Sequence, residues 1–221
     1  MAISKFNYNS FNVTPVASKA LAFNSDADGF TTASGSSMIL IKTLTASSSA
    51  TLSFVDGSSD VVLDNTYPVY KFVFIDIHPA TDAAEFQFQG NAAGGSGYNE
   101  TITSAGFAPR HSEDDTSEVG ISYQSANDKA QGTTFQDIFL NAGNANDECI
   151  SGSLILFNPS STTFVKNFIS RVQGAHNANS SFEYLFAGYF NTTAAIDEIR
   201  FQMSAGNIDA GTIKLYGIAD S

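Results

Sequence analysis

The sequence predicts an all-β protein: an antiparallel two-sheet β-sandwich that is jelly-roll-like and has an extended N-terminal arm. Three observations support this fold class. Many short runs alternate apolar and polar residues and are separated by turns rich in Gly, Ser, Asn and Asp, as in half-buried strands. The 221 residues include 19 Phe, 8 Tyr and no Trp, and Phe and Tyr suit pleated surfaces. No window of about 12 residues keeps the apolar period of a helix.

About eleven strands are expected after residue 37, with turn signals every 10 to 15 residues or so. The predicted strands are 38–44, 50–55, 68–78, 84–89, 119–124, 134–140, 151–158, 162–172, 182–190 and a final pair within 194–218. Residues 134–140 also fit a single helical turn, since Phe135, Ile138 and Phe139 have helical spacing. Residues 91–100 and 108–118 are expected to be loops, because Gly, Asn and charged residues dominate them.

Two of these segments carry more specific expectations. Residues 68–78 are apolar at both odd and even positions, which predicts a central strand covered on both faces. The final pair has clean alternation, with Ile199, Phe201 and Met203 on one side of the first strand. Ile213 and Leu215 return to the core side in the second strand. The simplest interpretation is a terminal hairpin that closes the sandwich.

The domain organisation predicted from the sequence is an N-terminal arm over residues 1–37 and a single β-sandwich domain over 38–221. The arm places the apolar residues Phe6, Tyr8, Phe11 and Val13 among Ser and Asn, and so it cannot build a core of its own. We therefore expect it to pack on its own domain or on a neighbouring subunit. The expected role of the arm is assembly, and these four residues are its candidate contacts.

Charge and composition exclude several classes of partner. The formal net charge is −12, and nucleic-acid binding depends on clustered Lys and Arg, so neither nucleic acid nor an anionic membrane is an expected partner. No apolar run is long enough to span a membrane, and the first residues do not resemble a secretory signal. Synthesis in a cytoplasm is expected. The single cysteine, Cys149, allows no internal disulfide and is interpreted as a bystander.

Motifs for catalysis are missing from the sequence, and the motif for a metal is incomplete. There is no phosphate-binding loop, nucleophile elbow or paired-cysteine motif, and the three histidines lie far apart in the sequence. Asn24, Asp26 and Asp28 match the first half of a calcium loop, but the twelfth position is Gly35 instead of Glu. Calcium is therefore a weak expectation, and no other cofactor is expected.

Four stretches of the chain carry a resemblance to a known group of proteins. They are residues 39–57, 67–82, 151–171 and 194–219, the last with the ending SGNI-x-x-GTIKLYG from Ser204 onward, with Ala205 in place of the second Ser. Over most of its length after residue 38, and in these stretches above all, the chain resembles virion structural proteins of marine tailed bacteriophages. The resemblance implies a β-rich, non-enzymatic protein that is released by host lysis and works as a trimer or ring with other virion proteins. It supplies no catalytic residue.

The first functional hypothesis is a tail-associated fibre or receptor-binding module. The loops 91–100, 108–118 and 174–181 would present side chains to a host-surface glycan, because loop tips on a rigid scaffold often carry function. The candidate binding residues are Tyr98, Tyr123, Asn177 and Tyr184.

Two alternatives remain open. A capsid decoration protein would use the arm and the flat sheet faces to join major capsid subunits. A jelly-roll carbohydrate-active enzyme would need two carboxylates about 5 to 10 Å apart, for which Asp76 and Glu85 are the available candidates.

Overall fold

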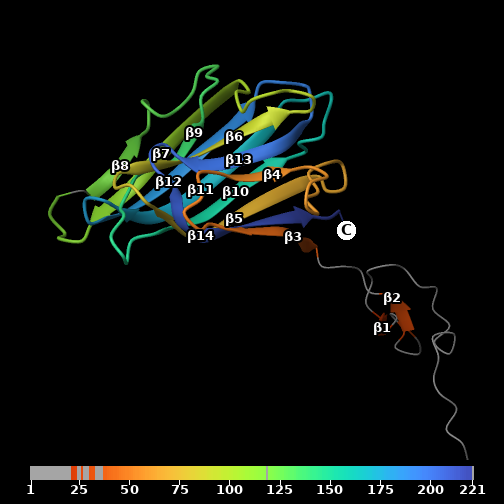
Figure 1. Ribbon diagram of the computed structural model, residues 1–221, viewed down its shortest axis with the longest axis horizontal. Coiled ribbons are helices and arrows are strands. Elements are labelled where there is room, and N and C mark those ends of the chain that lie inside the picture. The colour runs from red at the N-terminus through yellow and green to blue at the C-terminus, as the bar shows by residue number, and fades with distance from the viewer. Residues whose placement is uncertain (1–20, 24–25, 27–29, 33–36, 118, 221) are drawn as a thin grey trace, which may run out of the picture.

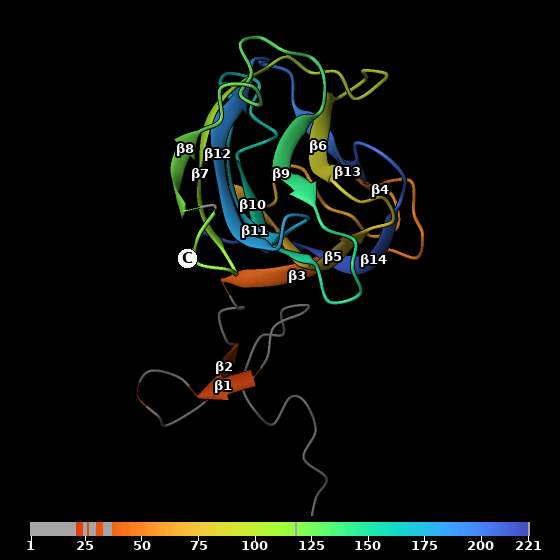
Figure 2. The same cartoon turned by 90° about the vertical axis from the view of Figure 1, so that its left-hand side faces the viewer.

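The computed structural model describes residues 21–23, 26, 30–32, 37–117 and 119–220 (Figure 1). These residues form fourteen β-strands and no helix, which confirms the all-β prediction. Twelve of the strands form one hydrogen-bonded network that folds into a large and a small sheet. Figure 2 shows the two sheets facing each other, with the long strands of the large sheet curving around the enclosed core.

The large sheet contains eight strands and the small sheet four. In spatial order the large sheet consists of β3 (Met38–Thr45), β14 (Ile208–Ile218), β5 (Val69–Pro79), β10 (Ile150–Phe157), β11 (Lys166–His176), β12 (Ser180–Phe190), β7 (Ile102–Ser112) and β8 (Val119–Tyr123). The small sheet consists of β9 (Gln136–Ala142), β6 (Ala84–Ala92), β13 (Ile196–Met203) and β4 (Leu52–Val55). A single pair, His176 with Ala142, connects them.

The order of strand pairing is that of a jelly roll. β3 pairs with β14 and β5 with β10 in the large sheet, while β4 pairs with β13 and β6 with β9 in the small sheet. Along the chain these four pairs are nested: β3–β14 is the outermost, β4–β13 and β5–β10 follow, and β6–β9 is the innermost. One long hairpin that wraps around a core produces this order. The remaining strands β7, β8, β11 and β12 widen the large sheet.

The terminal strands do not form the predicted hairpin. Ile199, Phe201 and Met203 are buried, as expected, and so are Ile213 and Leu215. However, β13 pairs with β4 and β6, whereas β14 pairs with β3 and β5. The turn between them carries the chain from one sheet to the other, because each strand completes a ladder begun by a strand far earlier in the sequence.

One glycine in the C-terminal stretch that begins at Ser204 has a structural task in this fold. Gly211 in β14 has a φ of +112°, and a Cβ at this position would lie 2.5 Å from the carbonyl oxygen of Asp76. Only glycine allows the two backbones to approach so closely. We infer that the glycine in this ending maintains the packing of β14 on β5.

The prediction that residues 68–78 are covered on both faces is wrong. Tyr70, Phe72 and Phe74 are buried, but Val73 on the other face is only half-buried and Ile75 is exposed. Asp76, with a φ of +50°, then interrupts the alternation at a β-bulge, so that Ile77 returns to the core. The apolar residues of the outer face therefore leave an uncovered sheet surface.

Residues 134–140 form a strand, not a helical turn. β9 runs from Gln136 to Ala142 and pairs with β6, and Ile138 and Phe139 are both fully buried. Their helical spacing misleads because a register irregularity in the β6–β9 ladder lets neighbouring residues both reach the core.

One central strand, β7, was not predicted, and residues 108–112 were expected to be loop. Apart from Ile102, the buried positions of this strand are small, namely Ser104, Gly106, Ala108 and Ser112, so most of it lacks the usual large apolar side chains. Gly106 has to be small because an added Cβ would lie 2.3 Å from the ring of Phe186 on β12. Pro109 is accommodated although β7 has a neighbour on each side.

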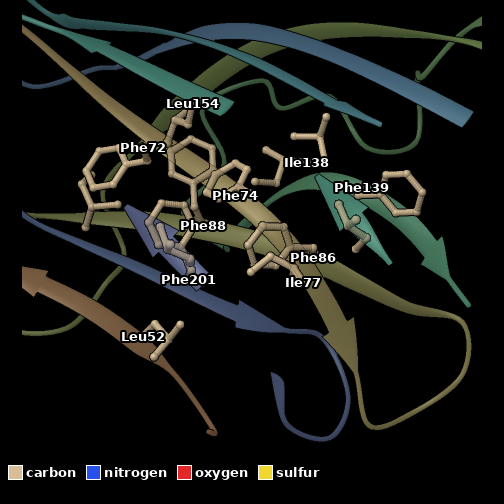
Figure 3. Packing of buried hydrophobic residues seen from close by; sticks show 14 of the residues in the cluster. Leu52, Phe72, Phe74, Ile77, Phe86, Phe88, Ile138, Phe139, Leu154 and Phe201 are labelled. Atoms are coloured by element: carbon tan, nitrogen blue, oxygen red, sulfur yellow. The ribbon is translucent and has the colours of Figure 1, made fainter. Parts of the chain in front are cut away.

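The core is a layer of phenylalanine rings between the two sheets (Figure 3). Phe201 of β13 lies at its centre, fully buried, with its ring centroid 5.2 Å from that of Phe74 and 5.3 Å from that of Phe72 on the facing sheet. Phe86 and Phe88 flank it within the small sheet. Most of these rings meet edge to face, the arrangement that aromatic pairs prefer.

Buried glutamines attach the long connections to this core. The Gln89 side chain is fully buried, and its Nε2 donates to the carbonyl oxygens of Glu100, Thr133 and Thr134 at 3.1 to 3.2 Å. Gln136 Nε2 donates in the same way to the carbonyl oxygen of Asn127 at 3.0 Å. Because a buried amide is costly without partners, these bonds specify where the connections lie.

Little of the predicted arm lies among the described residues. β1 (Leu21–Phe23) and β2 (Phe30–Thr32) pair with each other as a small separate sheet, with Phe23 and Phe30 stacked at 5.1 Å. The proposed assembly residues Phe6, Tyr8, Phe11 and Val13 lie outside the described residues. The same holds for Asn24 and Asp28 of the calcium candidate, while Asp26 is an exposed turn residue.

We predict that Phe201→Ala lowers the free energy of unfolding by about 3 to 5 kcal/mol, because it leaves a cavity among five aromatic rings. Phe164→Ala is the matched control, since that ring is 70% exposed and should cost less than about 1 kcal/mol. Urea unfolding followed by circular dichroism measures both. Equal losses in the two variants would contradict this account of the core.

We also predict that stability falls at alkaline pH through Tyr70. Burial raises the pKa of Tyr70 to about 12, and its hydroxyl donates to the Asp64 carbonyl oxygen and accepts from the Asp64 N–H. An unfolded tyrosine ionises near pH 10, so the stabilisation is complete below pH 10 and is lost as the pH rises towards 12, by about 1 to 3 kcal/mol.

The comparison that checks this uses Tyr70→Phe across the same pH range. At pH 8 the variant should be less stable by about 1 kcal/mol, because it loses the hydrogen bonds to Asp64. The difference between the two proteins should shrink and then reverse as the pH passes 10 to 11. A difference that stays constant would show that Tyr70 does not cause the alkaline loss.

Candidate functional site

Two of the three loops predicted to carry function come together at one end of the large sheet. The turn after β7 and the turn between β11 and β12 lie side by side, because Ser180 at the start of β12 pairs with Ser112 at the end of β7. The Glu113 N–H donates to the Asn179 carbonyl oxygen at 3.0 Å and joins the two turns directly. The pairing of strands distant in the sequence thus brings 108–118 and 174–181 together.

The third loop, 91–100, lies at the opposite end of the same sheet, beside the pair formed by Phe190 and Ile102. Its Tyr98 is half-buried. The Tyr98 hydroxyl donates to Glu198 Oε2 at 2.6 Å, and the guanidinium of Arg200 lies 3.7 Å from the ring centroid. Burial and the bond to Glu198 raise the pKa of Tyr98. Tyr98 therefore belongs to a separate cluster on the small sheet.

The other candidate binding residues are also separated from one another. Tyr184 is 2% exposed and packs against Phe139 and Phe182 in the core, so the prediction that it is a loop-tip residue is wrong. It belongs to the inward-facing row of β12. Asn177 is exposed at the β11–β12 turn, and Tyr123 is exposed on β8. The four residues do not form one site.

An open groove lies where the two turns meet, and we call it the loop-end groove. One hollow in it has a volume of about 350 Å³, and a second of about 380 Å³ shares His111, Gln173 and Ser181 with the first. Both volumes fall in the range of small-ligand sites, although the groove is open rather than enclosed. The residues that line it are Pro109, Arg110, His111, Ser112, Glu113, Gly120, Gln173, Gly174, Ala175, Ser180, Ser181 and Glu183.

Strand register aims the polar side chains of the groove in one direction. Gln173 on β11 lies opposite Glu183 on β12, and Ser181 on β12 lies opposite His111 on β7. Alternation along each strand then points all four outward, away from the core. Gln173 Nε2 donates to Ser181 Oγ at 3.4 Å, and Arg171 forms an ion pair with Glu183.

A network around Asp114 holds one wall of the groove in place. The Asp114 carboxylate accepts hydrogen bonds from Ser112 Oγ at 2.6 Å and from the backbone N–H groups of Thr116 and Ser117. The hydrogen bond from Ser112 and those from Thr116 hold the pKa of Asp114 well below its usual range. The next residue, Asp115, takes a left-handed turn conformation with a φ of +57°. The turn therefore keeps its shape at neutral pH.

The chemistry of the groove is that of hydrogen bonding to a polar ligand. Amide, hydroxyl, imidazole and carboxylate groups lie within a few residues of each other on a rigid sheet, so the groove has both donors and acceptors for a polyhydroxylated molecule. The sequence did not single out Gln173, Ser181 or Glu183. Only their polar positions between buried residues of β11 and β12 mark them as outward-facing.

A separate hollow of about 420 Å³, which shares no lining residue with the loop-end groove, brings together residues that the sequence left unrelated. It is lined by Asp76, His78, Cys149 and Asp209 among others. Cys149 Sγ lies 3.8 Å from Asp76 Oδ1, and His78 Nδ1 lies 3.8 Å from Asp209 Oδ2. Burial and the Asp76 carboxylate raise the pKa of the Cys149 thiol, which keeps it protonated at neutral pH and weakens it as a nucleophile.

Among the described residues, neither a cluster of three metal-ligating side chains nor the predicted pair of Asp76 and Glu85 occurs at this hollow. Within the described ranges, no three ligating side chains are placed to hold a metal ion. The two carboxylates considered for glycoside cleavage belong to different sheets. Asp76 lies at the bulge of β5, whereas Glu85 on β6 accepts a hydrogen bond from Ser204 Oγ and does not line the hollow.

We predict that Cys149 is alkylated by iodoacetamide at pH 8 about three- to tenfold more slowly than a free cysteine, because its raised pKa leaves little thiolate. Asp76→Asn removes the neighbouring negative charge and should raise the rate by about threefold. Asp209→Asn, on the His78 side of the hollow, is the control and should change the rate less. Alkylation of Asp76→Asn at the rate of the unsubstituted protein would contradict this interpretation.

The described part of the chain holds no helix that is long and apolar enough to cross a membrane. Comparison of the chain with family models, with curated proteins and with solved structures found no match.

Proposed function

We propose that this chain is a non-enzymatic structural protein of a tailed-bacteriophage virion, associated with the tail, and that its loop-end groove binds a host-surface glycan. The observation that carries the proposal is the convergence of the turns 112–117 and 177–179 on one open polar groove, joined by the bond from Glu113 to Asn179. The resemblance of the sequence stretches to virion proteins supports a place in a phage virion. The groove supports the binding of a glycan.

The rigidity of the groove favours glycan binding. Its polar side chains stand on strands of an eight-stranded sheet, so little conformational entropy is lost when a ligand orders them. The hydroxyl-rich lining offers the mixed donors and acceptors that sugar hydroxyls require. A groove of this openness suits a chain or branch of a surface polysaccharide better than a small enclosed ligand.

Capsid decoration is a second candidate, favoured by the uncovered apolar residues on the outer face of the large sheet, among them Ile75, Phe107 and Ile169. A cement protein needs such surfaces to join capsid subunits. The two roles share the fold and the particle, and they differ in copy number. Hundreds of copies per purified virion, in proportion to the capsid lattice, would favour decoration. Tens or fewer would favour the tail.

For the groove, we predict that Gln173→Ala combined with Ser181→Ala weakens glycan binding at least about tenfold, because two hydrogen-bonding groups are lost. Gln202→Ala on the small sheet is the matched control and should leave binding unchanged. Binding would be measured on arrays of bacterial surface polysaccharides and then by calorimetry with the best ligand. Binding that survives the double substitution would show that the groove is not the glycan-binding site. An array on which no polysaccharide binds would contradict glycan binding itself.

A further inference from the structure

The edge strand β8 exposes a surface that a lone chain leaves uncovered. Among the described strands β8 pairs with β7 alone, so one side of its backbone has no partner strand. Val119, Ile121 and Tyr123 are 59%, 67% and 60% exposed. Phe107 lies opposite Tyr123 on β7 and is 43% exposed. We call these four residues the β8 edge surface.

This edge lacks the usual protection against pairing with another strand. Natural proteins protect edge strands with Lys, Pro or a covering segment. β8 contains no charged residue and no proline, whereas β3, at the other edge of the large sheet, carries Lys42. An apolar edge of this kind is expected to pair with an added strand.

The N-terminal residues of the chain have the pattern of such a strand. Residues 5–13 place Phe6 and Tyr8 on one face of an extended segment and Phe11 and Val13 on the other, so that each face carries two apolar side chains. Residues 1–20 lie outside the described part of the chain. Their length, up to about 66 Å if fully extended, is ample for a strand plus a connection.

Charge complementarity supports the same match. Residues 1–23 contain Lys5 and Lys19 and no acidic residue, while the whole chain has a net charge of −12. The turn that leads into β8 carries Glu113, Asp114 and Asp115. A basic N-terminal segment would therefore lie near the acidic residues of this turn. Their attraction favours association and one orientation of the added strand.

The position of the segment favours a second copy as its source. It leads through β1 into β3, and β3 and β8 are the two opposite edges of the large sheet (Figure 1). In the single chain, Leu21 and Phe23 of β1 are 50% and 71% exposed. Apolar side chains of β1 and of the β8 edge surface are thus both left uncovered, as expected when the covering surface belongs to another molecule.

We propose that residues 5–13 of a second copy add to β8 as an extra strand, with Phe6 and Tyr8 beside the β8 edge surface and Phe11 and Val13 on the opposite face of the sheet. The donated segment and the accepting edge are different parts of the chain, so the contact is head-to-tail, and it closes into a ring where the rotation between copies allows it. This inference rests on the proposed virion role only for its biological setting. Its test uses the purified protein without virions or glycans, so the two proposals can fail separately.

The test is disulfide cross-linking between full-length chains that carry different substitutions. In a Cys149→Ser background, one chain carries Tyr8→Cys and a size tag, and the other carries Ile121→Cys. Mixed under mild oxidation, they should form the mixed disulfide dimer at least tenfold faster than when Ile169→Cys replaces Ile121→Cys. Ile169 is a matched control, since it is an exposed isoleucine on the same sheet but on the central strand β11. Phe6→Cys and Phe11→Cys test the neighbouring registers.

Two results would overturn the proposal. A link that forms only when both substitutions are in one chain would show that the segment covers its own edge. No link above the Ile169→Cys control in any of the three registers would show that it does not reach β8. In parallel, Ile121→Lys should convert the oligomer to monomer in native mass spectrometry, while Ile169→Lys should not. If Ile121→Lys fails to fold, the cross-linking result alone decides.

Discussion

The phenylalanine layer around Phe201 is the interaction on which the other features of this protein depend. Because no helix covers either sheet in the described residues, the two sheets must bury their inner faces on each other. Rings from β5 and β13 fill the space between them, within about 5 Å of one another. This contact fixes which face of every strand points inward. It therefore also fixes which residues point outward into the loop-end groove and along the β8 edge.

Much of the fold could be predicted from alternation alone, and the failures have physical causes. β11 and β12 alternate cleanly and were found. β7 was missed because close contact with Phe186 restricts its buried positions to small residues such as Gly106. The coverage of 68–78 was overestimated because the bulge at Asp76 is invisible in the sequence. The terminal hairpin failed because local pattern cannot tell which distant strand completes a ladder.

The candidate site was predicted only in part, since it depends on register. The sequence identified the loops 108–118 and 174–181, but nothing in it showed that Glu113 would bond to Asn179. Tyr184 looked like a binding residue because aromatic side chains serve both cores and sites, and its burial depends on the strand phase. The sequence does not mark Gln173 and Ser181 as site residues, because they form a groove only together with residues of other strands.

The location of the groove within the topology has a consequence for how this protein can change. Every residue that lines the loop-end groove belongs to β7, β8, β11, β12 or the turns that join them. None belongs to the eight strands whose nested pairs form the jelly roll. The inner faces of β11 and β12 still belong to the shared core, whereas their outer faces and turns form the groove. Changes at the outward-facing residues of these hairpins can therefore alter the groove without touching any strand pair of the frame.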